Sequence, residues 1–323
     1  MQPLELYVDY KKFSGINKLQ SARIDTYRTP VHALLEAENV DIDRTGMICS
    51  RDGRVLIKAG NFHSMKSFGN TCLIVQEGIL KILNKDYTLT QLKTGLSDAR
   101  VSYWYHDDKI YLTNTRLIGY VAENVYNEFP IFTYGITKPA LLSYFQKTKK
   151  NMPAGQLIAM YDNRLYVAVG NELWFSDPMA FHRTTIKKGF IKFKSYINLL
   201  LPVTDGIFVA DDTTYFLSGK NPKEFTMGEK SPYGAILYSA DEVTNQFIGL
   251  QALGVIEPQA KYFMWRSSVG SICLGGDGGF FRDLTIKKYP AIEGLKYGTG
   301  VFRQITNIAE NKNIYQYLSV VEK

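Results

Sequence analysis

The chain has 323 residues, of which 45% are hydrophobic and 13% aromatic, and its 38 Lys and Arg outnumber its 31 Asp and Glu to give a net charge of +7. This composition excludes a largely disordered chain, and the charge is too modest for a dedicated nucleic-acid-binding protein. We expect no membrane span and no secretion signal, because every apolar run is far shorter than the roughly 18 residues of a transmembrane helix and the first residues lack a basic region.

Residues 1–35 are expected to form an extended N-terminal arm, because they lack the paired turns that mark the rest of the chain. Such an arm would lie over the remainder of the protein or over a neighbouring subunit. Residues 30–38 are a candidate helix, with Thr29 as the N-cap and Pro30 in the first turn.

Residues 36–323 are predicted to form an all-β domain. Short runs rich in β-branched and aromatic residues, which are typical of strands, alternate with closely spaced pairs of turns. Asp-Gly, Asn-containing and Gly-containing pairs supply the positive φ angles of tight hairpins, so each unit is expected to form three antiparallel strands. The unit occurs five times, at residues 72–86, 101–115, 156–171, 197–212 and 262–278.

The spacing of these units predicts a β-propeller of about six or seven four-stranded blades. With Gly78, Asp108, Asn163, Gly206 and Gly270 as markers of the first turn, the steps are 30, 55, 43 and 64 residues. Their mean is close to the roughly 40 to 50 residues of a propeller blade. A pair of stacked β-sandwiches is the alternative, since its strands have turns at similar intervals.

Three further segments complete the predicted propeller. The longest step leaves room for a degenerate extra blade around residues 235–239, and residues 46–60 and 301–321 are candidates to share a closing blade. Residues 139–150 are a second candidate helix, because Pro139 suits a first turn and the lysines at the other end suit a helix C-terminus.

No enzyme motif is present in the sequence, so we expect no catalytic residue, metal or cofactor. The four histidines lie far apart without metal-ligand spacing, and there is neither a G-x-S-x-G nor a phosphate-binding loop motif. Cys49, Cys72 and Cys273 are widely spaced, which predicts unpaired thiols in a reducing compartment.

Two basic runs are candidate DNA-facing sites, since lysines neutralise phosphates. They comprise Lys147, Lys149 and Lys150 in the first run, and Lys187, Lys188 and Lys192 in the second. The alternative interpretation is that these lysines are solvated residues at strand edges, where they oppose aggregation.

Two stretches resemble bacteriophage virion proteins. Residues 13–17 (FSGIN), 37–46 (AENVDIDRTG) and 51–53 (RDG) are similar to the opening of such proteins, in which an arm leads into an N-V-D-I-D segment. Residues 171–181 (NELWFSDPMAF) resemble a blade segment of β-propeller proteins from phage tails and head-to-tail necks. The family includes accessory proteins that stabilise packaged DNA.

The resemblance implies a non-enzymatic virion protein of the tail or neck, made in the cytoplasm of a host bacterium and present as a ring of copies. Its partners would be other tail, connector or portal-proximal proteins, with packaged DNA as a further candidate. We take Phe13, Ile16, Asn17 and Tyr27 as candidate partner-binding residues of the arm. The alternative function is a carbohydrate-binding or glycan-cleaving propeller for host receptor recognition, which exposed aromatic residues beside paired carboxylates would favour.

Overall fold

The computed structural model describes residues 40–42, 48–50, 55–243, 261–286, 290–307 and 312–322. The expected arm with Phe13, Ile16, Asn17 and Tyr27 lies outside the described residues, as does the candidate helix at 30–38. The strands β1 (Val40–Ile42) and β2 (Ile48–Ser50) pair with each other and with no other described strand.

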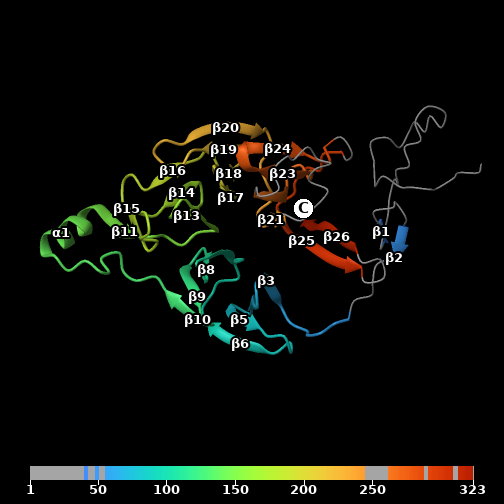
Figure 1. Cartoon of the computed structure of the whole chain (residues 1–323), viewed down its shortest axis with the longest axis horizontal. Coiled ribbons are helices and arrows are strands. Elements are labelled where there is room, and N and C mark those ends of the chain that lie inside the picture. The colour runs from blue at the N-terminus through green and yellow to red at the C-terminus, as the bar shows by residue number, and fades with distance from the viewer. Residues whose placement is uncertain are drawn as a thin grey trace, which may run out of the picture.

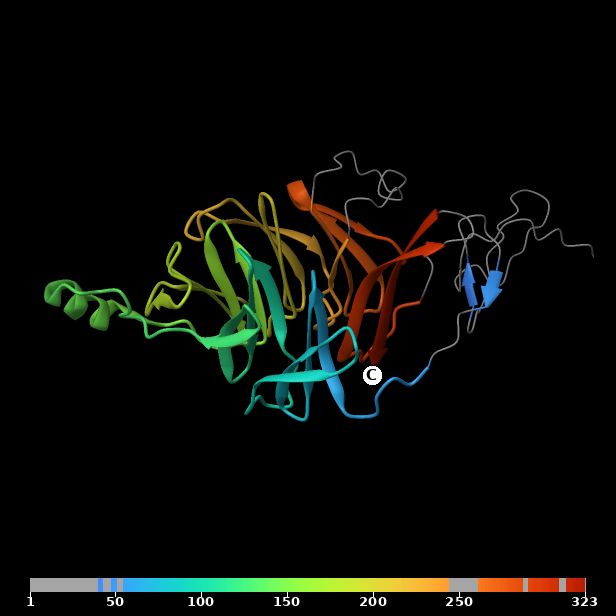
Figure 2. The same cartoon turned by 60° about the horizontal axis from the view of Figure 1, so that its bottom comes forward.

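Five antiparallel sheets of four strands follow one another along the chain around a common axis (Figures 1 and 2). They are sheet 1 with β3 (Phe62–Phe68), β4 (Thr71–Gln76), β5 (Ile79–Leu83) and β6 (Leu89–Lys93); sheet 2 with β7 (Ser102–His106), β8 (Lys109–Asn114), β9 (Leu117–Ala122) and β10 (Val125–Glu128); sheet 3 with β12 (Leu157–Tyr161), β13 (Arg164–Val169), β14 (Glu172–Phe175) and β16 (Phe190–Lys192); sheet 4 with β17 (Leu199–Val203), β18 (Gly206–Ala210), β19 (Thr214–Ser218) and β20 (Thr226–Ser231); and sheet 5 with β21 (Asp241–Val243), β22 (Tyr262–Arg266), β23 (Ile272–Gly276) and β24 (Phe280–Asp283). A short 3-10 helix, η1 (Asp277–Gly279), connects the last two strands.

The sixth position of the ring is held by a long hairpin of β25 (Tyr297–Asn307) and β26 (Lys312–Glu322), called the closing hairpin below. The first strands of the five sheets and β25 together line a central cavity of about 1080 Å³. The all-β propeller predicted from the paired turns is therefore confirmed.

Consecutive sheets are joined by separate hydrophobic clusters, as expected when blades pack face to face. One cluster joins sheets 1 and 2, a second joins sheets 2 and 3, a third joins sheets 3 and 4, and a fourth joins sheets 4 and 5. A smaller cluster in sheet 5 contacts Phe302 and Tyr317 of the closing hairpin. Strands such as β12, β17 and β18 are buried along their whole length, which explains why their sequences are continuous apolar runs.

The predicted tight turns are present, although they do not all occupy the same place in a sheet. Asp108 and Asn163 have φ of 54° and 58° and connect first and second strands, and Gly206 is the first residue of a second strand, directly after such a turn. Gly78 and Gly270 instead lie between second and third strands. This shift explains much of the uneven spacing of the markers.

Two details of the predicted closure are wrong within the described residues. Around residues 235–239 there is an isolated bridge between Ala235 and Ser267 rather than an extra blade. Residues 301–321 do belong to the closing hairpin, but described residues of 46–60 do not pair with them, since β25 and β26 form a two-stranded sheet of their own.

Candidate functional site

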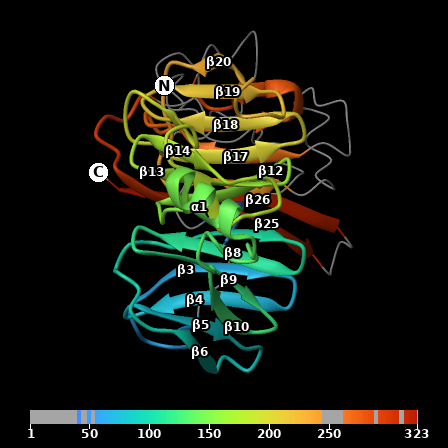
Figure 3. The same ribbon diagram turned by 90° about the vertical axis from the view of Figure 1, so that its left-hand side faces the viewer.

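A projection extends from sheet 3, and it contains the helix of the described structure (Figures 1 to 3). The chain leaves β10, forms α1 (Pro139–Thr148) and returns through β11 (Lys149–Asn151). β11 pairs with β15 (Arg183–Thr185), which belongs to a second excursion between β14 and β16. The predicted helix is thus confirmed up to Thr148, and it ends there because the next three residues pair as a strand.

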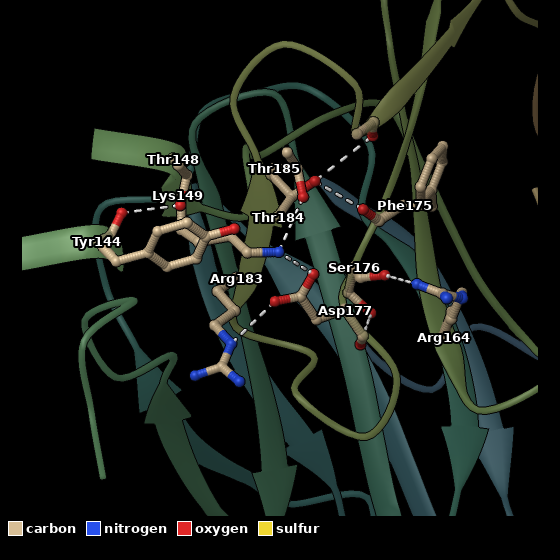
Figure 4. Close-up of polar contacts among 11 residues, drawn as sticks. Tyr144, Thr148, Lys149, Arg164, Phe175, Ser176, Asp177, Arg183, Thr184 and Thr185 are labelled. Carbon is tan, nitrogen blue, oxygen red and sulfur yellow. Dashed lines mark hydrogen bonds and ion pairs between the residues drawn. The ribbon is translucent and has the colours of Figure 1, made fainter. Parts of the chain in front are cut away.

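Asp177 holds the base of the projection through two cations (Figure 4). Its carboxylate oxygens accept Lys149 Nζ at 2.6 Å and Arg183 Nε at 3.0 Å. Lys149 Nζ also donates to Thr185 Oγ1 at 2.8 Å. All three charged side chains are between 15% and 21% exposed, so water screens these pairs less than it screens ordinary surface pairs. The network therefore ties β11 and β15 to the loop after β14.

Buried hydroxyl groups fix that loop on sheet 3 (Figure 4). Ser176 Oγ accepts the Leu165 N–H at 2.9 Å and donates to the Asp177 carbonyl at 2.9 Å. Thr184 Oγ1 donates to the Phe175 carbonyl at 2.6 Å. Ser176 and Thr184 are both fully buried, so losing either bond would leave a buried backbone group without its partner.

Residues 171–181 thus form β14 and the start of this loop, where Ser176 and Asp177 make the contacts that hold the loop in place.

Aromatic rings contact Arg183 of this network and the neighbouring Lys150. Arg183 Cζ lies 4.7 Å from the centroid of the Phe145 ring on α1, and Lys150 Nζ lies 3.6 Å from the Trp174 ring on β14. These cation–π contacts add to the ion network in holding the helix close to sheet 3. His182 lies beside Arg183, and burial lowers its pKa, with the Arg183 charge lowering it further.

The outer surface of the projection has exposed apolar side chains, one of which, Tyr134, contacts the His182 ring edge to face with centroids 6.4 Å apart. α1 has no buried residue. Leu141 and Tyr144 of the helix are 47% and 58% exposed, and Ile131 and Tyr134 before it are 65% and 68% exposed. Four large apolar side chains exposed on one short excursion are typical of an interaction surface.

Exposed lysines accompany this apolar surface. The Ile186 N–H donates to the Thr148 carbonyl at 3.0 Å, which continues the pairing of β11 with β15 and brings Lys147 and Lys187 to the same end. Lys138 and Lys188 are also exposed. Lys147 of the first run and Lys187 of the second, 40 residues apart, therefore meet on the projection, whereas Lys192 lies on β16 of sheet 3.

The six candidate DNA-facing lysines fall into two groups in the structure. Lys147, Lys187, Lys188 and Lys192 are exposed. Lys149 is paired with Asp177, and Lys150 covers the Trp174 ring, so their ammonium groups already have partners within the chain. Sequence reasoning missed Asp177, Arg183 and the exposed apolar residues, although Ser176 and Asp177 lie within the segment 171–181 that the sequence analysis singled out.

Other sites are less developed in the described residues. No three His, Cys, Asp or Glu side chains of this part of the chain gather to hold a metal ion, and none of its helices has the length and apolar character to cross a bilayer. Cys72 and Cys273 have unpaired thiols.

Comparisons with known proteins add no functional information. No family model and no curated protein matches the sequence. Solved structures with a similar fold include the N-terminal domain of Nup159 (10% identity, TM-score 0.43, 80% of this chain and 74% of that chain) and the Pan2 WD40 domain of Neurospora crassa (11% identity, TM-score 0.42, 72% and 67%). Hsv2 of Kluyveromyces lactis is another (10% identity, TM-score 0.42, 84% and 89%).

Proposed function

We propose that this chain is a non-enzymatic structural protein of a phage virion, located in the tail or the head-to-tail neck, and that its projection docks on a neighbouring virion protein. The observation that carries the proposal is the projection itself, in which a helix without a buried residue is held by a partly buried ion network. Helices in proteins depend on tertiary packing, so a partner that covers α1 would stabilise it. The resemblance of residues 171–181 to phage propeller proteins supports the virion as the place.

The chemistry of the projection defines the partner surface. Ile131, Tyr134, Leu141 and Tyr144 would enter an apolar groove, since aromatic and aliphatic anchors contribute most to the affinity of an interface. The surrounding lysines would face carboxylates at the rim of that groove, where charge guides association and register. We therefore propose a partner whose groove has an acidic rim.

Contact with packaged DNA is a second role that we propose for the exposed lysines. Replacing Lys147, Lys187, Lys188 and Lys192 by Glu should abolish any DNA binding of the purified protein, and the wild-type affinity should fall steeply with salt because bound counterions are released. A wild-type protein that shows no salt-dependent binding to duplex DNA would contradict this role and leave the docking role unaffected.

Particle composition tests the main proposal. Virions of the phage that encodes this chain should contain it at a fixed low copy number relative to the major capsid protein, as measured by quantitative mass spectrometry. The double variant Leu141→Ser with Tyr144→Ser should fold and be absent from particles. Met227→Ser is the matched control, because Met227 on β20 is 47% exposed, as Leu141 is. Absence of the wild-type chain from virions would overturn the virion assignment, and normal incorporation of the double variant would overturn docking through the projection.

A further inference from the structure

A second hollow, of about 460 Å³, lies where three hairpin turns of sheets 1 and 2 come together. The turns are β3–β4, β7–β8 and β9–β10, and all three contribute side chains to its lining. The residues that could contact a ligand are Phe68, Asn70, Tyr105, Asp108, Glu123 and Asn124. Phe68 and Tyr105 also line the central cavity, so the hollow opens beside the mouth of that cavity.

An exposed aromatic ring forms one wall of the hollow. Tyr105 is 50% exposed and stacks on Phe68, with ring centroids 6.1 Å apart and an interplanar angle of 20°. Phe68 holds the Tyr105 ring from one side, which fixes a flat apolar surface at the edge of the protein. The negative face of such a ring attracts the positively polarised C–H groups of a sugar ring.

Planar hydrogen-bonding groups surround that ring. The Tyr105 hydroxyl donates to Asp108 Oδ1 at 2.7 Å, which orients the carboxylate. Glu123 contributes a second carboxylate, and Asn70 and Asn124 contribute amides that can both donate and accept. Carboxylates and amides present two adjacent polar atoms, a geometry that matches two neighbouring hydroxyl groups of a sugar.

The backbone holds these groups in place before any ligand binds. Asp108 has φ of 54°, and Glu123 and Asn124 have φ of 49° and 61°, values typical of tight two-residue hairpin turns. Because these short turns between paired strands fix the backbone, binding does not have to order the backbone at these positions, which favours affinity.

The charged residues that line the hollow indicate the class of ligand. The lining includes the carboxylates of Asp108 and Glu123 and no Lys, Arg or His. An anionic ligand would be repelled, whereas a neutral ligand with many hydroxyl groups would meet an aromatic platform and several acceptors. We propose that this hollow binds a neutral sugar residue, as a glycan-recognition site that is separate from the docking projection.

Saturation-transfer NMR tests the site with defined probes. The purified full chain would be mixed in turn with the methyl glycosides of glucose, galactose, mannose and N-acetylglucosamine. Saturation should transfer to the ring protons of at least one of them. The signal should be lost in Tyr105→Ala, which removes the platform, and in Asp108→Ala, which removes an acceptor.

The matched control is Tyr196→Ala, because Tyr196 is 46% exposed and does not line the hollow. It should keep the signal of the wild-type protein. Thermal unfolding of each variant shows whether the propeller is intact. Tyr105→Phe is a second variant, which keeps the aromatic ring and should therefore keep the saturation transfer. Absence of transfer to all four probes, or equal transfer in Tyr105→Ala and wild type, would overturn the proposal.

Discussion

The interface between sheets 3 and 4 and the closure of the ring hold the propeller together by different means. Between sheets 3 and 4, most of the contact is apolar and includes Tyr166, Leu173, Ile207 and Val209, all of which are fully buried. At the closure, where sheets 1 and 5 meet the closing hairpin, polar contacts accompany a smaller apolar cluster. Asp241 of β21 pairs with Lys66 of β3 and accepts the Phe302 N–H of β25 at 2.7 Å.

Further polar contacts reinforce the closure. Arg100, just before β7, donates through Nη1 to the Gly298 carbonyl of β25 and lies over the Tyr238 ring. The Tyr317 hydroxyl of β26 donates to the Ser239 carbonyl. Sheets 3 and 4 are joined by a short connection, whereas the closure brings together residues 175 positions apart, such as Lys66 and Asp241. Directional contacts determine which strands meet. The comparison therefore teaches that apolar packing between sheets 3 and 4 contributes stability, whereas polar contacts at the closure determine how the strands that close the ring are aligned.

The largest effect is expected for a cavity in the apolar interface. Ile207→Ala should lower the free energy of unfolding by about 2–5 kcal/mol, because it removes fully buried methyl and methylene groups that sheet 3 cannot refill. Urea denaturation would measure this loss. Ile207→Val, which removes a single methylene, should cost about 1 kcal/mol. Equal losses for the two variants would show that the site relaxes and is not close-packed.

The next largest effect is expected at Asp241, which is the centre of the closure. Asp241→Ala should cost about 1–3 kcal/mol, because it leaves the Phe302 N–H without its acceptor and Lys66 without its partner. Asp241→Asn keeps one acceptor and should cost less.

Hydrogen exchange distinguishes this effect from a general loss of stability. Amides of β25 should exchange faster in Asp241→Ala, while those of β17 and β18 keep their protection under conditions where local opening dominates. A uniform increase over all sheets would contradict a separate role for the closure.

The sequence predicts the apolar interface between sheets 3 and 4 better than the polar contacts of the closure. Runs such as residues 197–203 and 207–210 predict strands directly, within one or two residues of β17 and β18, and Asp162-Asn163 predicts the turn between β12 and β13. Hydrophobic burial is not directional, so composition and spacing are sufficient to locate it. The exact partner of a charged side chain depends on the completed fold.

Lys149 illustrates this limit. In the sequence it stands in a basic run, and its charge alone suggests a phosphate ligand. In the structure it pairs with Asp177, which lies 28 residues away and reaches it because β11 pairs with β15. The exposed lysines that remain for a partner could be identified only after this pairing was known. The same holds for the hollow between sheets 1 and 2, whose lining comes from three separate hairpin turns.

Asp177 makes polar contacts outside the ring of sheets. Replacing it therefore tests whether polar contacts can fix the position of the projection without contributing much to the free energy of unfolding. Asp177→Ala should lower the free energy of unfolding by only about 1 kcal/mol. It should nevertheless release the projection, so that limited proteolysis cleaves residues 129–151 faster than in the wild type. Asp177→Glu is the control that keeps the charge. An unchanged cleavage rate in Asp177→Ala would show that the aromatic contacts of Phe145 and Trp174 suffice.

The smallest effect on stability is expected from lowering the pH, which should destabilise the closure and leave the apolar interface unchanged. Burial and the Arg100 charge lower the pKa of His63 on β3, near the closure, while Asp98 opposes them. A histidine whose pKa is lower in the folded than in the unfolded chain binds more protons when unfolded, so its contribution to stability falls as the pH drops through the unfolded value of about 6.5. Among the described residues, the apolar interface between sheets 3 and 4 contains no histidine.

Between pH 7 and pH 5.5, hydrogen-exchange protection should therefore fall first in β3 and β25, once the intrinsic pH dependence of exchange is subtracted, with β17 and β18 unchanged. His63→Gln, which cannot take up a proton in this range, should remove the difference between the two regions. If β17 and β18 lost protection together with β25 in the wild type, acid would act on the whole ring. The closure and the apolar interface would then open together as one cooperative unit, although the two regions differ in their share of polar and apolar contacts.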